Sequence, residues 1–183
     1  MSIRIPLAAF LLTALLPLAG WGQGHHGHGQ AAAASPSPYV GQQARDIKAL
    51  APEQVAALLD GGGMGYAKAA ELNHYPGPRH VIDLAEHLQL SETQRARAEA
   101  VFAAMQTRAR ELGADILRHE RELDAAFGAS AIDDQTLERL TARIATLEGE
   151  LRVTHLRAHR DMRAFLTPAQ VSAYDRLRGY AAP

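Results

Sequence analysis

The chain has 183 residues, 47% of them hydrophobic but only 5% aromatic, which suits one modest domain with flanking segments. Its 19 basic and 20 acidic side chains nearly balance, so net charge gives no basic footprint for nucleic acid. The sequence contains no cysteine, which excludes disulfides, thiolate metal ligands and cysteine nucleophiles within it.

Residues 1–20 have the layout of a secretory signal peptide. A single charge, Arg4, precedes an apolar run that ends in small residues. The run is short for a membrane-spanning helix and contains Pro6 and Pro17. We therefore expect export to the periplasm, with cleavage near residues 19–22. An uncleaved inner-membrane anchor is the alternative.

Residues 21–38 consist mainly of Gly, Ala, Ser, Pro and His, without charge or apolar periodicity. Such a composition predicts a disordered tether. Its histidines His25, His26 and His28 lie close together, and neighbouring imidazoles bind Zn, Cu or Ni without a preformed fold. We predict a metal-binding tail, with a plain hydrophilic spacer as the alternative.

Residues 39–77 read as two short helices separated by Gly61–Gly63. Pro52 suits the first turn of the first helix, and the second, at about 64–72, ends at the prolines of "NHYPGP". The stretch "GGGMG" follows no strand and lacks the lysine of a phosphate-binding loop, so we interpret it as a helix break. The role of this segment stays open.

Residues 78–180 predict a helical domain. A short helix at about 79–89 precedes two long ones, whose apolar residues recur every three or four positions from Ala98 to Phe127 and from Leu137 to Phe165. The short connection at 128–134 makes these two helices antiparallel neighbours. No alternating pattern calls for a strand. The predicted fold class is all-α, built on a long antiparallel helical hairpin.

Two capping boxes mark helix starts at about 92 and 168. Ser91 and Gln94 form the first box; Thr167 and Gln170 form the second, with Pro168 between them at the first helical position. In each box the hydroxyl caps a backbone N–H, while the Gln side chain reaches back to the cap residue. These residues therefore begin helices, whatever else they do.

The two boxes together resemble the LTxxQ motif of the Spy/CpxP family, which includes ZraP-like and CnrX-like metal-responsive proteins. The resemblance covers about residues 79–180. Its first copy has Ser where the motif has Thr. The residues that carry it are Leu90, Ser91 and Gln94, followed by Leu166, Thr167 and Gln170.

This resemblance implies a periplasmic helical protein that forms a curved homodimer or a larger assembly. It also implies ATP-independent chaperone activity, modulation of envelope-stress signalling, or periplasmic metal sensing. Partners would be unfolded or misfolded envelope proteins and a signalling protein such as a sensor kinase or an anti-sigma factor. No catalytic motif is present, so we expect neither enzyme activity nor a required cofactor.

His155 and His159 are the candidate metal ligands within the helices. Their spacing of four residues places both on one helix face, although an HxxxH pattern alone is weak. Folding the hairpin about its loop brings them level with Met105 and Glu99, either of which is a candidate third ligand, with a partner subunit supplying a fourth. Alternatively, His155 ends the apolar stripe and His159 is solvated.

Three functions follow from these observations. The first is a periplasmic chaperone that holds unfolded clients on its helices. The second is a heavy-metal sensor or metal-binding resistance protein that uses the histidines. The third is a purely structural helical dimer.

Overall fold

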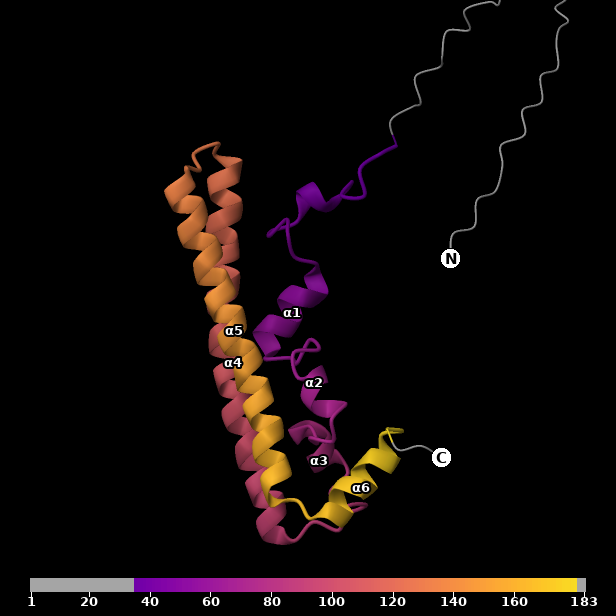
Figure 1. The fold of residues 1–183 in the computed structure, drawn as a ribbon. Helices are drawn as coiled ribbons and strands as arrows, with labels where there is room; N and C mark the ends of the chain where they lie inside the picture. The colour runs from indigo at the N-terminus through magenta and orange to yellow at the C-terminus, as the bar shows by residue number, and fades with distance from the viewer. Residues whose placement is uncertain (1–34, 181–183) are drawn as a thin grey trace, which may run out of the picture. The chain divides into compact units, whose positions relative to one another are not determined.

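The computed structural model of the chain describes residues 35–180, and the regular structure in this range is entirely helical (Figure 1). No described helix is long and apolar enough to cross a membrane. The elements are η1 Gln42–Ala44, α1 Pro52–Asp60, α2 Lys68–Glu71, α3 Pro78–Asp83, α4 Glu92–Gly128, α5 Asp134–Phe165 and α6 Pro168–Leu177.

Helices α4 and α5 form the predicted antiparallel hairpin (Figure 1). The side chain of Asp133 caps α5 by accepting the N–H of Thr136 at 2.7 Å. The apolar stripes of both helices are buried over most of their length, but not at the hairpin tip, where Phe127 is 56% exposed. The predicted hairpin is confirmed, and its tip is exposed.

Residues 39–60 pack on the hairpin. Ile47 and Leu58 enter a buried cluster with apolar side chains of α4 and α5. Helix α1 approaches α4 so closely at Gly113 that a Cβ there would lie 2.1 Å from the carbonyl oxygen of Leu58. Ion pairs at the rim, such as Lys48 Nζ to Asp124 Oδ2 at 2.7 Å, add polar contacts. The N-terminal segment is therefore part of the folded domain.

The two predicted short helices after residue 61 are shorter than expected. Met64 has φ 40° and Gly65 has φ 80°, which a right-handed helix cannot accommodate, so α2 begins only at Lys68. Helix α3 ends at Asp83 and is followed by turns up to Gln89, which also has a positive φ of 51°. The predicted bounds of 64–72 and 79–89 were wrong for this reason.

Both predicted capping boxes are confirmed. Gln94 N–H donates to Ser91 Oγ at 3.2 Å, and Gln170 N–H donates to Thr167 Oγ1 at 3.2 Å. In return, each Gln Oε1 accepts the backbone N–H of its own cap residue, at 3.0 and 2.9 Å. A second apolar cluster joins α6 to the base of the hairpin. Its buried members are Val81, Leu88, Ala98, Met162, Leu166, Val171 and Tyr174, with Leu90 partly buried beside them.

Candidate metal-binding site

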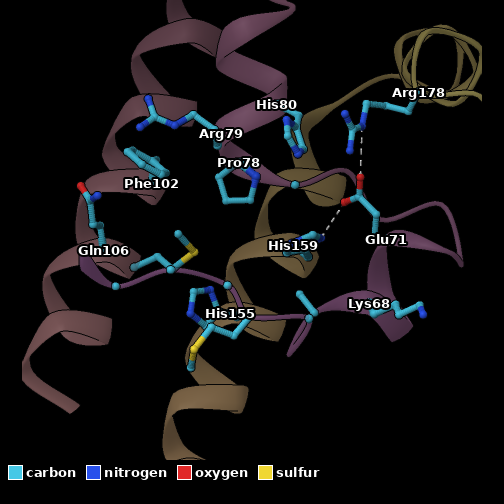
Figure 2. A pocket seen from close by; sticks show the side chains of 18 of the residues that line it. Lys68, Glu71, Pro78, Arg79, His80, Phe102, Gln106, His155, His159 and Arg178 are labelled. Atoms are coloured by element: carbon cyan, nitrogen blue, oxygen red, sulfur yellow. Dashed lines mark ion pairs between the residues drawn. The ribbon is translucent and has the colours of Figure 1, made fainter. Parts of the chain in front are cut away.

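A cavity of about 530 Å³ lies between the hairpin and the segment that runs from Asp60 to His80 (Figure 2). Two histidines of α5, two methionines and several charged side chains line it. The lining includes Met64, Lys68, Glu71, Arg79, His80, Met105, His155, His159 and Arg178. The guanidinium of Arg79 lies over the ring of Phe102, 4.7 Å from its centre, in a cation–π contact.

His155 and His159 lie on consecutive turns of α5 and reach the same cavity (Figure 2). Their exposed fractions are only 3% and 8%. The alternative interpretation of His159 as a solvated residue was therefore wrong. It is buried because residues 71–77 lie over this part of α5, and the Nδ1 atom of His159 contacts the Tyr75 carbonyl there.

The His155 imidazole has an unused nitrogen. Its Nε2 is buried and has no hydrogen-bond partner among the described residues. The ring stacks on Tyr66 with centroids 6.3 Å apart. Burial lowers the pKa of His155, nearby His159 lowers it further, and a hydrogen bond with the Gly62 backbone opposes them. The neutral imidazole that metals require is thus favoured, and a buried unpartnered nitrogen costs about 1–3 kcal/mol without a ligand.

His159 is oriented for ligand binding by its other nitrogen. Nδ1 lies 2.8 Å from the Tyr75 carbonyl oxygen, which only accepts, so Nδ1 carries a proton and Nε2 has the lone pair of the neutral ring. This arrangement, with a carbonyl behind the ring, is the usual second shell of a metal-binding histidine. A Cβ at position 77 would lie 3.4 Å from Nε2 of His159. Because Gly77 has no side chain, the space beside that nitrogen stays open.

The methionines supply thioether groups to the cavity. Met105 lines it, as the hairpin geometry predicted, whereas Glu99 is exposed and does not line it. Sequence reasoning missed Met64, which also lines the cavity. Its signal was a methionine within a run of glycines, which we had interpreted only as a helix break.

The carboxylate nearest to the histidines is already engaged. Glu71 Oε1 accepts the hydroxyl of Tyr174 at 2.6 Å and that of Tyr180 at 3.1 Å, and it lies 3.5 Å from Arg178 Nε. Glu71 Oε2 lies 3.5 Å from His159 Nδ1 (Figure 2). Between residues 35 and 180, no three His, Cys, Asp or Glu residues are grouped to hold a metal. A site here therefore needs the thioethers or a further ligand.

The remaining predicted ligands, His25, His26 and His28, lie outside the described residues. His80 lines the cavity, and its pKa is lowered by burial and by nearby Arg178. The donors that the fold brings to the cavity are thus the imidazoles of His80, His155 and His159 and the thioethers of Met64 and Met105.

The fold and the cavity define a small all-helical protein that gathers nitrogen and sulfur donors against one face of a helical hairpin. Residues 62–173, more than half of the chain, match the heavy-metal resistance family. The chain therefore belongs to that family, which is part of the Spy/CpxP-like helical group. All five donor residues fall inside the match. Comparisons with curated proteins and with solved structures give no significant match.

Proposed function

We propose that the chain is a periplasmic metal-binding protein of heavy-metal resistance or sensing, with a folded site formed by His155, His159 and Met105. The observation that carries this proposal is the buried, unpartnered Nε2 of His155 in the cavity wall. The second imidazole on the next turn, with its proton held on the far nitrogen, supports it. Membership of the heavy-metal resistance family is independent support.

A metal bound here would connect two layers of the protein. Its ligands would come from α4 and α5, while Tyr75 and the Gly62 backbone, which contact the two imidazoles, belong to the segment that covers the hairpin. Binding would therefore stabilise the packing of that segment on the hairpin, by the differential affinity of the metal for the closed arrangement. A sensor would report this metal-dependent change in the packing of the covering segment. The histidine tail would capture metal with low specificity.

Calorimetric titration of Zn, Cu and Ni tests the proposal. The chain is used whole, with His25, His26 and His28 replaced by alanine so that the tail does not contribute. We expect one equivalent to bind with an affinity that His155→Ala and His159→Ala each weaken by at least ~10-fold. The matched control is His119→Ala, a buried histidine of α4 that pairs with Glu122 and does not line the cavity.

Two results would contradict the proposed metal site in the folded domain. One is the absence of binding once the tail histidines are replaced. The other is an unchanged affinity in both α5 histidine variants. In either case metal binding would be confined to the tail or to surface groups.

The chaperone function, which the sequence analysis placed first, has no specific support from the family match. It stays a prediction, as do the homodimer or larger assembly, the envelope clients, the signalling partner and the lack of enzyme activity. Suppression of aggregation of an unfolded client at equimolar amounts would test the chaperone hypothesis directly.

A further inference from the structure

Met64 occupies a backbone position that disfavours it. Its φ of 40° lies in the left-handed region, where a side chain with a Cβ is rarely found. The residues around it, Gly61–Gly63 and Gly65, are all glycine, which adopts such conformations freely. The one side chain in this five-residue loop is a thioether, and it lines the cavity beside the histidines. Strain of this kind at a cavity wall suggests a functional role for the side chain.

The donors available in the cavity are soft. With Met64 included they are the imidazoles of His80, His155 and His159 and two thioether sulfurs. Thioethers select Cu(I), whereas Zn takes thiolate, imidazole and carboxylate ligands and Ni takes imidazole. The nearby carboxylate of Glu71 has its Oε1 held by Tyr174, Tyr180 and Arg178, and its Oε2 lies 3.5 Å from Nδ1 of His159, the nitrogen that does not bind the metal.

The charges around the cavity disfavour a divalent cation more than a monovalent one. Lys68, Arg79 and Arg178 line it. The two acidic residues in the wall are each close to an arginine: Asp60 Oδ1 pairs with Arg110 at 2.9 Å, and Glu71 lies 3.5 Å from Arg178. Because Coulomb repulsion scales with the charge of the bound ion, a divalent cation meets about twice the repulsion that a monovalent one meets here.

We propose that the cavity is a Cu(I) site in which the glycine loop supplies Met64 as a soft ligand alongside Met105, His155 and His159. This inference rests on the proposed function, because it specifies the metal and adds a ligand to that site. It involves no redox step, since copper binds in its reduced state and both imidazoles bind in their neutral form.

Anaerobic competition with bicinchoninate for Cu(I) tests this inference. The parent is the whole chain with His25, His26 and His28 replaced by alanine. We expect Met64→Leu, which keeps the size of the side chain but removes the sulfur, to lower Cu(I) affinity by ~10–100-fold. The affinity for Zn should not change. Leu72→Ala is the matched control, because Leu72 is an exposed apolar residue that lines the same cavity without a donor atom.

A second variant separates binding from folding. Met64→Gly removes the sulfur and also relieves the positive φ, so it should raise the melting temperature of the metal-free protein while lowering Cu(I) affinity. A merely structural role for Met64 would instead change stability and leave Cu(I) affinity intact.

The outcomes distinguish this inference from the function on which it rests. If the parent binds Zn more tightly than Cu(I), or if Met64→Leu keeps the parental Cu(I) affinity, the Cu(I) assignment is wrong while the histidine site stands. If the parent binds neither Cu(I) nor any divalent metal, both proposals fail together.

Discussion

The side-chain amides of Gln94 and Gln170 hydrogen-bond each other reciprocally. Gln94 Nε2 donates to Gln170 Oε1 at 2.9 Å, and Gln170 Nε2 donates to Gln94 Oε1 at 3.0 Å. Each Nε2 also donates to a backbone carbonyl near the other motif, Phe165 at 3.1 Å and Leu88 at 3.2 Å respectively. The two glutamines thus cap their own helices and join the start of α4 to the start of α6. The repeated motif is a clasp at the open end of the hairpin.

Replacing Gln94 by glutamate should break this clasp. The carboxylate cannot donate, so the two bonds that Gln94 Nε2 donates, to Gln170 Oε1 and to the Phe165 carbonyl, are lost and the charge faces these two acceptor oxygens. The carboxylate can still accept the bond from Gln170 Nε2. We expect a loss of about 2–3 kcal/mol in the free energy of unfolding, measured by chemical denaturation. Gln135→Glu, at an exposed position in the first turn of α5, is the matched control and should change stability by less than about 0.5 kcal/mol. Equal losses in the two variants would show that the clasp does not stabilise the fold.

Tyr174→Phe should destabilise the packing of α6. The Tyr174 hydroxyl is buried, donates to Glu71 and accepts the N–H of Gly77 at 3.1 Å. Its removal leaves the Gly77 N–H without a partner and takes one hydrogen bond from Glu71, which keeps its contacts with Tyr180 and Arg178. The expected cost is about 1–3 kcal/mol at neutral pH, measured by denaturant titration. Tyr180→Phe, which removes a bond of 3.1 Å to the same Glu71 oxygen and a long one of 3.4 Å from Arg178, should cost less.

The same tyrosine predicts a pH dependence at alkaline pH. Burial, reinforced by the hydrogen bond to Glu71, raises the pKa of Tyr174 far above its ordinary value. The folded state therefore holds this proton more tightly than the unfolded state. Its contribution to stability is fully present below about pH 10, the ordinary tyrosine pKa, and is lost as pH rises beyond it. The difference in stability between the parent and Tyr174→Phe should shrink above pH 10; a constant difference up to pH 11 would contradict this.

Gly113→Ala and Gly149→Ala should have opposite effects. A Cβ at Gly113 meets the Leu58 carbonyl at 2.1 Å, so α1 must move away from α4, at a cost of about 1–3 kcal/mol. Gly149 lies in α5 with nothing within 4 Å of its Cβ position, so alanine there should stabilise the helix by about 0.5–1 kcal/mol. Thermal unfolding of the two variants measures the contrast. A stable Gly113→Ala protein would mean that α1 is not held against α4 as described.

Gly77→Ala should weaken metal binding without removing any ligand. The added methyl group would lie 3.1 Å from Cε1 and 3.4 Å from Nε2 of His159, which fills the approach to that nitrogen. We expect a loss of metal affinity of about 10-fold, similar to the loss caused by removing a residue that orients a metal ligand. Gly63→Ala, where the Cβ position meets nothing within 4 Å although Gly63 also lines the cavity, should bind as the parent does. Equal affinity in both variants would place the metal away from His159.

The sequence predicted the elements whose causes are local. The hairpin follows from apolar periodicity, and the starts of α4 and α6 follow from the chemistry of Ser91 and Thr167. The proximity of His155, His159 and Met105 follows from hairpin register, because a single short loop fixes which residues face each other.

The missing parts of the site depend on tertiary contacts that no periodicity signals. Residues 61–77 contain little regular helix, so their packing over α5 could not be derived from a pattern. That packing buries His159, fixes its tautomer through Tyr75 and brings Met64 to the cavity. Positive φ values at Met64 and Gln89, which shorten the neighbouring helices, likewise reflect the surrounding structure rather than residue preference.

X-ray absorption at the copper edge tests the central claim most directly. The sample is the whole chain with the three tail histidines replaced by alanine, loaded anaerobically with one equivalent of Cu(I). The account predicts imidazole and sulfur scatterers together, with the imidazole signal lost in the His155→Ala, His159→Ala double variant. A spectrum that the double variant leaves unchanged would contradict a metal site in this cavity, and a spectrum without sulfur would contradict the thioether ligands.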